Sequence, residues 1–320
     1  MEKVLDILII GSGPAGLSAA IYGKRAKLAV AVGEKEYEGT GQIAESGRVD
    51  NYLGLPGISG YDLGERFREH ALELGVDFIE LEATKIEEVP VKEATEKEGS
   101  GKESKTLWKV TFEDESSQLA KTVVYAAGAK PRKLNIPGEE EFIGKGISFC
   151  AICDGAFYKE KTVAVIGGGD TALDDALHLS KICKKVYLIH RRDTFRGAAH
   201  TVELVKSTGN IELVLNATVE KICGEKTVSG IVLKDGTTLA VDGVFMAIGS
   251  TPQTALLKGI TDMDEHGYVY ADENGKTNRP GIFVAGDVRA KKLRQVVTAV
   301  ADGACAATAA YEYIFGAMRN

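Results

Sequence analysis

A strand–glycine turn–helix–strand pattern occurs twice in this chain, and it constrains the fold more strongly than any other feature. In each copy a short apolar run enters a glycine-rich turn, and residues with helical spacing and a second apolar run follow. This order predicts a βαβ unit, whose two strands are parallel and belong to one sheet. The segments are 6–10, 11–16, 17–26 and 28–32 in the first copy, and 162–166, 167–172, 171–180 and 185–189 in the second.

Both glycine turns fit the GxGxxG/A pattern of dinucleotide-binding sites. The first glycine permits a tight turn, the second lets the backbone approach a pyrophosphate, and the third small residue lets helix and strand pack closely. The helix N-terminus then faces the phosphates. The pattern alone is weak, because tight glycine turns are common, but the flanking strands and helix make it specific. The predicted binding residues are Gly11, Ser12, Gly13, Pro14, Ala15 and Gly16 at the first turn, and Gly167, Gly168, Gly169, Asp170 and Thr171 at the second.

The two copies differ at the end of the second strand, where such a unit contacts the ribose. Glu34 and His190 each lie 23 positions after the first glycine of their turn. A carboxylate there accepts hydrogen bonds from a ribose 2′-hydroxyl and repels a 2′-phosphate, which suits FAD or NAD at the first site. Guanidinium groups suit a 2′-phosphate instead. We therefore expect NADPH at the second site, contacted by His190, Arg191, Arg192 and Arg196; the alternative is a solvated basic turn.

Composition is that of an ordinary globular protein with room for two domains, since the chain has 320 residues, 44% hydrophobic and 27% charged. The formal net charge is −7, so neither nucleic acid nor an anionic membrane is expected as a partner. The apolar runs are too short to span a bilayer, and the first residues lack the pattern of a signal peptide. We therefore expect a cytoplasmic protein.

Two cysteines at CxxC spacing, Cys150 and Cys153, precede the second glycine turn, and Asp154 follows them directly. Such a pair is redox-active, ligates zinc or is incidental. Structural zinc usually needs four close ligands, and no histidine pair lies at ligand spacing, so redox chemistry between the two nucleotide motifs is favoured. Asp154 is expected to cap a helix, to donate a proton, or to do both. The remaining cysteines are isolated in the sequence and are expected to be buried hydrophobic residues: Cys183, Cys223 and Cys305.

Together these motifs resemble those of the low-molecular-weight thioredoxin reductases, a class of pyridine nucleotide-disulfide oxidoreductases, over essentially the whole chain. The resemblance implies an enzyme that uses FAD and NADPH, forms a homodimer and reduces the disulfide of thioredoxin. It also implies that Cys153 lies beside the flavin, that Cys150 attacks the thioredoxin disulfide, and that Asp154 acts as acid and base. The motifs that carry the resemblance are Gly11–Gly16, Gly41-Gln42, Cys150–Asp154, Gly167–Ala172, His190–Arg196, Ala285–Val288 and Arg294-Gln295.

The resemblance further implies an α/β architecture with two Rossmann-like dinucleotide-binding domains, the second inserted into the first. The discontinuous FAD-binding domain would comprise residues 1–128 and 250–320, and the NADPH-binding domain with the dithiol would comprise 129–249. The residues implied to contact FAD beyond the first turn are Glu34, Lys35, Gly41, Gln42, Asn51, Gly128, Gly286, Asp287, Arg294 and Gln295, and Ile248 is implied to contact NADPH.

Three residues depart from the usual pattern of this class. Thr40 precedes Gly41 where glycine is more usual, and Ala127 and Ile152 each replace a threonine. A charged stretch at 92–105 is longer than usual and is expected to form the solvated tip of a hairpin. Two alternative functions stay open: a reductase of another thioredoxin-like or peroxiredoxin-linked protein dithiol, and a flavin dithiol oxidase that passes electrons to oxygen. The arginines that suit NADPH argue against the oxidase.

Overall fold

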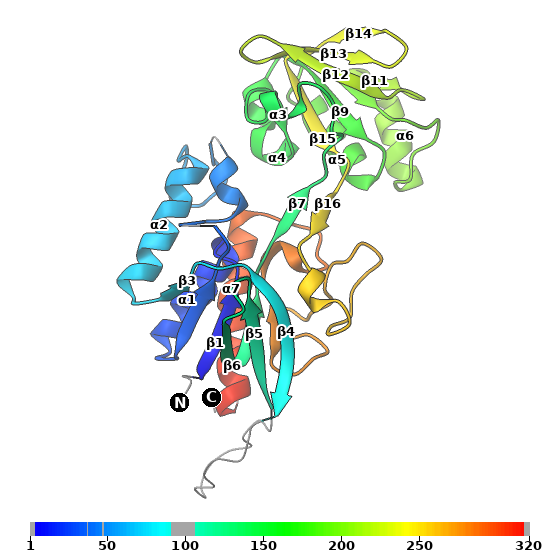
Figure 1. Cartoon of the computed structure of the whole chain (residues 1–320). Helices are drawn as coiled ribbons and strands as arrows, with labels where there is room; N and C mark the ends of the chain where they lie inside the picture. The colour runs from blue at the N-terminus through cyan, green and yellow to red at the C-terminus, as the bar shows by residue number, and fades with distance from the viewer. Residues whose placement is uncertain (1–3, 37, 47, 91–105, 317–320) are drawn as a thin grey trace, which may run out of the picture. The chain divides into compact units, whose positions relative to one another are not determined.

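The computed structural model of the chain contains two compact units, which are described separately (Figure 1). The first unit joins Met1–Lys130 to Thr251–Asn320, and the second is Pro131–Ser250. The chain leaves the first unit once, completes the second and returns. These limits fall within two residues of those expected for an inserted domain at 129–249. The structure describes residues 4–36, 38–46, 48–90 and 106–316.

A seven-stranded sheet forms the centre of the first unit. Its strands are β1 (Leu5–Ile10), β2 (Val30–Gly33), β3 (Asp77–Ile79), β4 (Ala83–Pro90), β5 (Thr106–Phe112), β6 (Ser117–Tyr125) and β17 (Ile282–Val284). The order is β3-β2-β1-β6-β5-β4, with β17 beside β6. β1 and β2 are parallel neighbours, which confirms the first predicted βαβ unit. β4 and β5 are antiparallel, and the expected hairpin tip between them, 92–105, lies outside the described residues.

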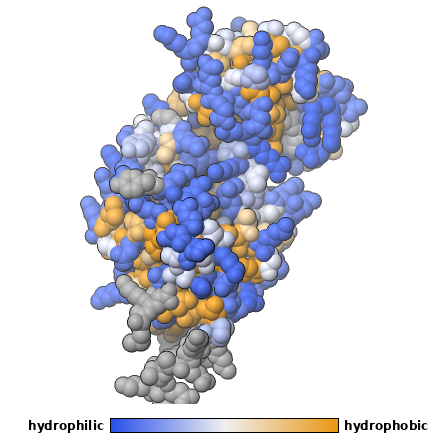
Figure 2. Space-filling model, viewed as in Figure 1, coloured by the Kyte–Doolittle hydropathy of each residue, from blue (hydrophilic) through white to orange (hydrophobic). Residues whose placement is uncertain are grey.

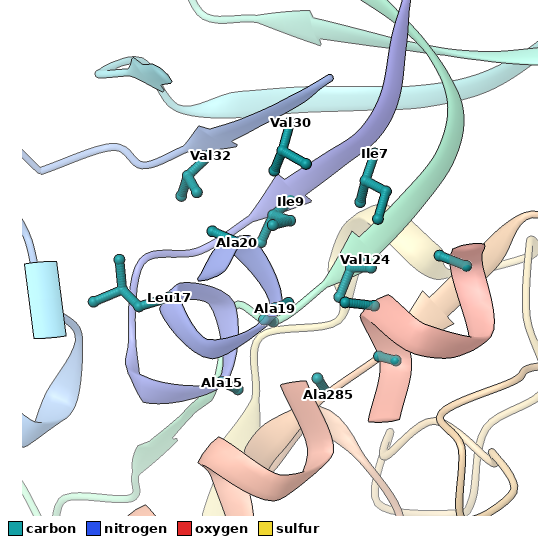
Figure 3. Close-up of a cluster of buried hydrophobic side chains, with 14 of the residues drawn as sticks. Ile7, Ile9, Ala15, Leu17, Ala19, Ala20, Val30, Val32, Val124 and Ala285 are labelled. Atoms are coloured by element: carbon teal, nitrogen blue, oxygen red, sulfur yellow. The ribbon is translucent and has the colours of Figure 1, made fainter. Parts of the chain in front are cut away.

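Helices cover this sheet and complete its core. They are α1 (Pro14–Arg25), α2 (Gly60–Glu73) and α7 (Val296–Phe315), with short 3₁₀ helices η1 (Gln42–Glu45), η3 (Ala255–Leu257) and η4 (Gly286–Val288). Apolar side chains of β1, β2 and β6 meet alanines of α1 and α7 in one buried cluster (Figure 3). Successive strand residues point to opposite faces, so Ile7 and Ile9 join this cluster while Leu8 and Ile10 join the cluster on the other face. Burial on both faces explains the nearly unbroken apolar sequence of β1.

A five-stranded parallel sheet forms the centre of the second unit. Its strands are β8 (Ile147–Ser148), β9 (Thr162–Gly167), β10 (Lys185–Ile189), β11 (Ile211–Val214) and β15 (Gly243–Ala247). The order is β11-β10-β9-β15-β8, so the second predicted pair, β9 and β10, is parallel and adjacent. The helices are α3 (Glu139–Phe142), α4 (Ala151–Asp154), α5 (Asp170–Ser180) and α6 (Ala199–Ser207), with the 3₁₀ helix η2 (Gly155–Tyr158). A separate antiparallel sheet contains β12 (Val219–Gly224), β13 (Val228–Leu233) and β14 (Thr238–Ala240).

The two segments that connect the units pair with each other as a short two-stranded ribbon. Its strands are β7 (Ala129–Pro131) and β16 (Ser250–Pro252). Backbone hydrogen bonds of 2.9 Å flank it, from the N–H of Arg132 to the oxygen of Gly249 and from the N–H of Gln253 to the oxygen of Gly128. The outgoing and returning chain therefore lie side by side.

The limits of several elements differ from expectation for local reasons. The helix expected at 17–26 begins at Pro14, because proline fits the first helical turn, where its missing N–H has no partner to lose. The strand expected at 28–32 begins at Val30, because the N–H of Leu28 still bonds the oxygen of Gly23 in the turn after α1. Figure 2 shows hydrophilic residues over much of the visible face of both units, with smaller apolar patches between them. In the ranges that the structure describes, no helix has both the length and the apolar character needed to cross a bilayer.

Candidate active site

The first glycine turn joins β1 to α1, and its three glycines have different surroundings. Gly11 has φ +104°, and a Cβ there would lie 2.6 Å from the carbonyl oxygen of Ala126. A Cβ at Gly16 would lie only 1.8 Å from the carbonyl oxygen of Gly11. The protein's own backbone therefore excludes a side chain at both positions. A Cβ at Gly13 would have no heavy atom nearer than 3.8 Å, so packing within the protein does not explain this glycine.

The second glycine turn, between β9 and α5, repeats this arrangement. A Cβ at Gly167 would lie 2.2 Å from the carbonyl oxygen of Ala247, whereas a Cβ at Gly169 would have no heavy atom within 4 Å. In both turns the middle glycine leaves open space at the N-terminus of the following helix. A pyrophosphate would use this space to approach the backbone N–H groups. The residues present at both turns thus fit a dinucleotide.

Glu34 follows β2 and is held against the first turn. The backbone N–H of Ser12 donates to Oε2 of Glu34 at 2.9 Å, and the Ser12 hydroxyl lies 2.7 Å from the same oxygen. The other carboxylate oxygen accepts the N–H of Glu36 at 3.2 Å. These contacts fix the carboxylate beside the turn, which is the position that recognition of a ribose requires.

The loop after Glu34 brings one predicted residue to the turn and leaves another in solvent. Gly41 has φ +75°, and a Cβ there would lie 2.8 Å from the Cα of the middle glycine of the turn. Gln42 follows it as the first residue of η1, whereas Lys35 is exposed. Thr40 is buried, and a Cβ at Gly64 of α2 would lie 2.5 Å from its hydroxyl oxygen. The glycine in α2 therefore makes room for this departure from the usual sequence.

The predicted C-terminal FAD residues include buried polar atoms with unused hydrogen-bonding capacity. Oδ1 of Asp287 and Nε of Arg294 are buried, and neither has a hydrogen-bond partner in the described part of the chain. Burial raises the pKa of the Asp287 carboxyl above its ordinary value, although the charges of Lys291 and Arg294 oppose the shift. Leaving a buried polar atom unpaired costs about 1–3 kcal/mol. Both atoms are therefore candidates for contacts to a bound cofactor.

The structure also brings together predicted residues that are distant in sequence. Nδ2 of Asn51 donates to Oε1 of Gln295 at 2.7 Å, although 244 positions separate them. Gln295 is the N-cap of α7 and forms a capping box with Thr298. Gly128 has φ +71°, and a Cβ there would meet nothing within 4 Å. Gly286, also at positive φ, lies against the start of α1, where its Cβ would come 2.9 Å from that of Ala15.

Cys150 and Cys153 form a disulfide, with their Cα atoms 5.3 Å apart. Cys150 is the N-cap of α4, and the backbone N–H of Cys153 lies 3.2 Å from its sulfur. This N–H would stabilise a thiolate on Cys150 after reduction. Both cysteines are half-buried, whereas Ile152 between them is 58% exposed. Of the isolated cysteines, all expected to be buried, only Cys183 is buried. Cys223 is half-buried because β12 is an edge strand, and Cys305 is half-buried because α7 has a solvent-facing side.

Asp154 ends α4 and is held by Ser148 of β8. The Ser148 hydroxyl donates to Oδ2 of Asp154 at 2.6 Å, and the same hydroxyl accepts the backbone N–H of Cys150 at 3.0 Å. Burial raises the pKa of Asp154 above its ordinary value, and the hydrogen bond from Ser148 opposes the shift. Asp154 precedes η2 but makes no side-chain capping bond, so the expected capping role is wrong. The second expected role, proton donation, fits a carboxyl whose pKa is raised, because it stays protonated to higher pH than an ordinary aspartate.

The residues predicted to contact NADPH surround the second glycine turn. The loop after β10 folds back over this turn, because the N–H of Arg196 donates to the oxygen of Gly168 at 2.8 Å. Oδ1 of Asp170 holds the same loop by accepting the N–H of Ala198 at 2.8 Å. Of the two further residues predicted to contact NADPH, Thr171 is exposed and Ile248 is half-buried.

The histidine and the arginines of this loop take different positions. His190 is 7% exposed, and its ring stacks on that of Phe195 with the ring centroids 5.4 Å apart. Burial lowers the pKa of this imidazole, which favours the neutral form. Arg191, Arg192 and Arg196 are exposed, and they make no ion pair with any residue that the structure describes. Three guanidinium groups are therefore available to an anionic ligand.

Two residues that contact predicted site residues, one in each unit, were not predicted. Ser148 precedes Cys150 by two positions, and nothing in the sequence distinguishes it from other serines. Asp302 accepts the backbone N–H of Gly286 at 3.0 Å. It is the only charged residue between Val296 and Tyr311, within a helix of small residues, and that isolation is the signal that could have found it.

Comparisons with known proteins agree over nearly the whole chain. A family model described as pyridine nucleotide-disulphide oxidoreductase matches residues 5–303. A thioredoxin reductase of Peptoclostridium acidaminophilum is 40% identical over 330 residues, covering 98% of each chain. One from Treponema pallidum (strain Nichols) is 41% identical over 320 residues, again with 98% of each chain covered. The crystal structure of thioredoxin reductase from Streptococcus pyogenes MGAS5005 superposes with a TM-score of 0.87 at 37% identity, covering 98% of this chain and 99% of that one.

Proposed function

Because this chain belongs to the pyridine nucleotide-disulphide oxidoreductase family, we propose that it is an NADPH-dependent flavoenzyme that reduces the disulfide of thioredoxin. The observation that carries the proposal is the disulfide between Cys150 and Cys153 in a unit that also contains a dinucleotide-type turn. Asp154, with its raised pKa, lies beside that disulfide. A disulfide, a protonatable carboxyl and two nucleotide sites are the parts that such a reaction needs.

We assign FAD to the first unit and NADPH to the second. FAD, when bound, accepts hydride from NADPH and supplies two electrons to a disulfide. The residues that would hold FAD are those of the first turn, with Glu34 at the ribose and the unpaired Oδ1 of Asp287 as an acceptor for a hydroxyl group. In the second unit the turn would bind the pyrophosphate of NADPH, and the exposed arginines its 2′-phosphate.

The dithiol carries the electrons to the protein substrate. Two electrons and two protons convert the Cys150–Cys153 disulfide into two thiols. The Cys150 thiolate then attacks the thioredoxin disulfide, forms a mixed disulfide and releases one thioredoxin thiol. Cys153 attacks the Cys150 sulfur, which restores the Cys150–Cys153 disulfide and releases the second thiol. Asp154 gives and takes the proton that each departing or attacking thiolate requires. The sum is one NADPH and one proton consumed per disulfide reduced.

An anaerobic titration tests this function. The purified protein should be yellow, NADPH should bleach its flavin, and oxidised thioredoxin should restore the colour. A flavin that NADPH does not bleach would refute the donor. A flavin that NADPH bleaches but no thioredoxin reoxidises would refute the substrate, and a panel of other thioredoxin-like and peroxiredoxin-linked proteins would then identify the acceptor. Rapid reoxidation by oxygen alone would identify a dithiol oxidase.

We further propose a homodimer in the cytoplasm, supported by the resemblance to the thioredoxin reductases and by the acidic composition. Sedimentation equilibrium measures the mass in solution. A mass of one chain at micromolar concentration would refute the dimer.

Replacing either Arg191 or Arg192 should change the choice of nicotinamide cofactor. Each charge-assisted bond to a phosphate is worth about 1.5–3 kcal/mol, so Arg191→Ala and Arg192→Ala should each raise KM for NADPH about 10- to 100-fold. KM for NADH should stay within about twofold, because NADH lacks the 2′-phosphate. Steady-state kinetics with both cofactors gives the comparison. The control is Lys181→Ala, an exposed cation of the same unit, which should change neither constant; equal losses for NADPH and NADH would contradict the assignment.

Asp154 should control the pH dependence of disulfide reduction. Its raised pKa keeps the carboxyl protonated to higher pH, so activity that needs this proton declines as pH rises through that pKa. Asp154→Asn should lower kcat about 10²- to 10⁴-fold and remove this decline. Ser148→Ala removes the hydrogen bond that lowers the pKa, so its decline should move to higher pH. The measurement is kcat against pH; an unchanged profile in Asp154→Asn would exclude Asp154 as the proton donor.

A further inference from the structure

Asp302 is a largely buried carboxylate on α7 that the proposed reaction does not use. Its side chain is 12% exposed. It lies in a helix whose other residues between Val296 and Tyr311 carry no charge. Burying a carboxylate is costly unless hydrogen bonds and opposite charges compensate. Neighbouring groups must therefore compensate the charge of Asp302.

Among the residues that the structure describes, the groups that contact this carboxylate lie in the short segment that carries Asp287. The backbone N–H of Gly286 donates to Oδ2 of Asp302 at 3.0 Å, and Nζ of Lys291 lies 2.7 Å from the same oxygen. Nη1 of Arg289 lies 2.5 Å from Oδ1. The Asp302 side chain on α7 thus binds the 286–291 segment at three residues, Gly286, Arg289 and Lys291.

Arg289 extends this attachment to a second loop. Its Nη2 donates to the carbonyl oxygen of Asp272 at 2.6 Å, while Nη1 is engaged by Asp302. The side chain of Arg289 is only 10% exposed. The segment is therefore fixed from two sides, by a helix and by a loop.

The geometry of the segment determines where the Asp287 carboxyl lies. Gly286 has φ +75° and packs against the start of α1, where a Cβ would meet that of Ala15 at 2.9 Å. Asp287 follows directly, and its Oδ1 is buried without a partner among the residues that the structure describes. The ammonium group of Lys291 is held by Asp302, and its charge already acts on the Asp287 carboxyl, so an ammonium group released from Asp302 would be attracted to Oδ1.

We propose that Asp302 is a positioning residue for FAD: it fixes the Gly286–Asp287 turn and engages Lys291, so that Oδ1 of Asp287 stays free for the cofactor. This inference rests on the proposed binding of FAD to the first unit. Without the charge of Asp302, Lys291 pairs with Asp287 and occupies the oxygen that the cofactor needs. Removing Lys291 as well leaves that oxygen free again.

The test measures the binding of FAD to the apo-protein, and the change in flavin fluorescence reports the binding. Asp302→Asn keeps the size of the side chain and an acceptor for the Gly286 N–H, and it should raise Kd for FAD about 10- to 100-fold. The double variant Asp302→Asn with Lys291→Met should recover most of this loss. Such a rescue distinguishes the charge effect from general destabilisation, which a second substitution would deepen. Glu312→Gln, on the same helix and paired with Lys276, is the matched control and should bind FAD like the wild type.

The outcomes separate this inference from the function itself. If the wild type binds no FAD, the proposed function fails first. If the wild type binds FAD and Asp302→Asn binds it equally well, or if the double variant is weaker than the single one, the role of Asp302 is refuted while the function stands. Thermal unfolding of the apo-proteins reports folding. If Asp302→Asn does not fold, Arg289→Met replaces it, with an expected increase in Kd of about 3- to 10-fold; an unchanged Kd would refute the proposal.

Discussion

Replacing Cys153 with serine abolishes turnover of thioredoxin, to below about one thousandth of the wild-type rate, while FAD and NADPH still bind. The disulfide of Cys150 and Cys153 is the link between two-electron donors and a protein substrate, and a hydroxyl group cannot form it. NADPH should still bleach the flavin of the variant, because the hydride step does not involve the dithiol. Stopped-flow absorbance separates that step from turnover of thioredoxin.

The Cys150→Ser variant should be equally inactive but different in colour. It leaves Cys153 as a thiolate beside the flavin, which should give a long-wavelength charge-transfer band, whereas Cys153→Ser should show none. A charge-transfer band in Cys153→Ser instead of Cys150→Ser would show that the roles of the two thiols are reversed. Cys305→Ser is the control, since this isolated cysteine lies on α7 outside the dithiol. Full activity in Cys150→Ser or Cys153→Ser would show that the dithiol takes no part in the reaction.

The third glycine of the first turn should be the position least tolerant of a methyl group. A Cβ at Gly16 would lie 1.8 Å from the carbonyl oxygen of Gly11, so α1 and β1 must separate to admit alanine. Overpacking of a core costs about 1–3 kcal/mol and more when backbone must move, so Gly16→Ala should destabilise the first unit by at least about 3 kcal/mol. Thermal or urea unfolding of the apo-protein measures the loss, and FAD binding should fail with it.

The middle glycine provides the matched control, because the same added methyl group should act differently. A Cβ at Gly13 has no neighbour nearer than 3.8 Å, and its φ of −65° suits any residue. The free energy of unfolding of Gly13→Ala should therefore lie within about 1 kcal/mol of the wild-type value. The variant should nevertheless bind FAD at least about 10-fold more weakly, because the methyl group occupies the space of the pyrophosphate. A Gly13→Ala protein that binds FAD normally would show that the phosphates do not approach this turn.

Local sequence was sufficient for the repeated units, because each is determined by short-range rules. The strand predicted at 185–189 is β10 with the same limits, and the helix predicted at 171–180 begins one residue earlier. Two short apolar runs, a glycine-rich turn and helical spacing between them are all visible within about 25 residues of sequence. Glu34 could be placed at its turn for the same reason, since the spacing of a βαβ unit is nearly constant.

The remainder could not be predicted, because it depends on contacts between distant segments. The hydrogen bond between Asn51 and Gln295 and the attachment of Gly286 to Asp302 exist only once α7 packs on the first sheet. Ser148 acquires its role because β8 ends beside α4, and a two-residue strand leaves no periodic signal. The assignment of the individual cofactor contacts is a prediction from the resemblance, and the variants above test it.

The paired connecting strands β7 and β16 make the second unit a modular insertion. Because the oxygen of Gly128 and the N–H of Gln253 are already hydrogen-bonded, residues 128 and 253 would be adjacent even if everything between them were removed. A tight hairpin of a few residues could replace the whole second unit without reconnecting any strand of the first. A single recombination event could therefore exchange the second unit for another insert, and the first unit would keep its fold.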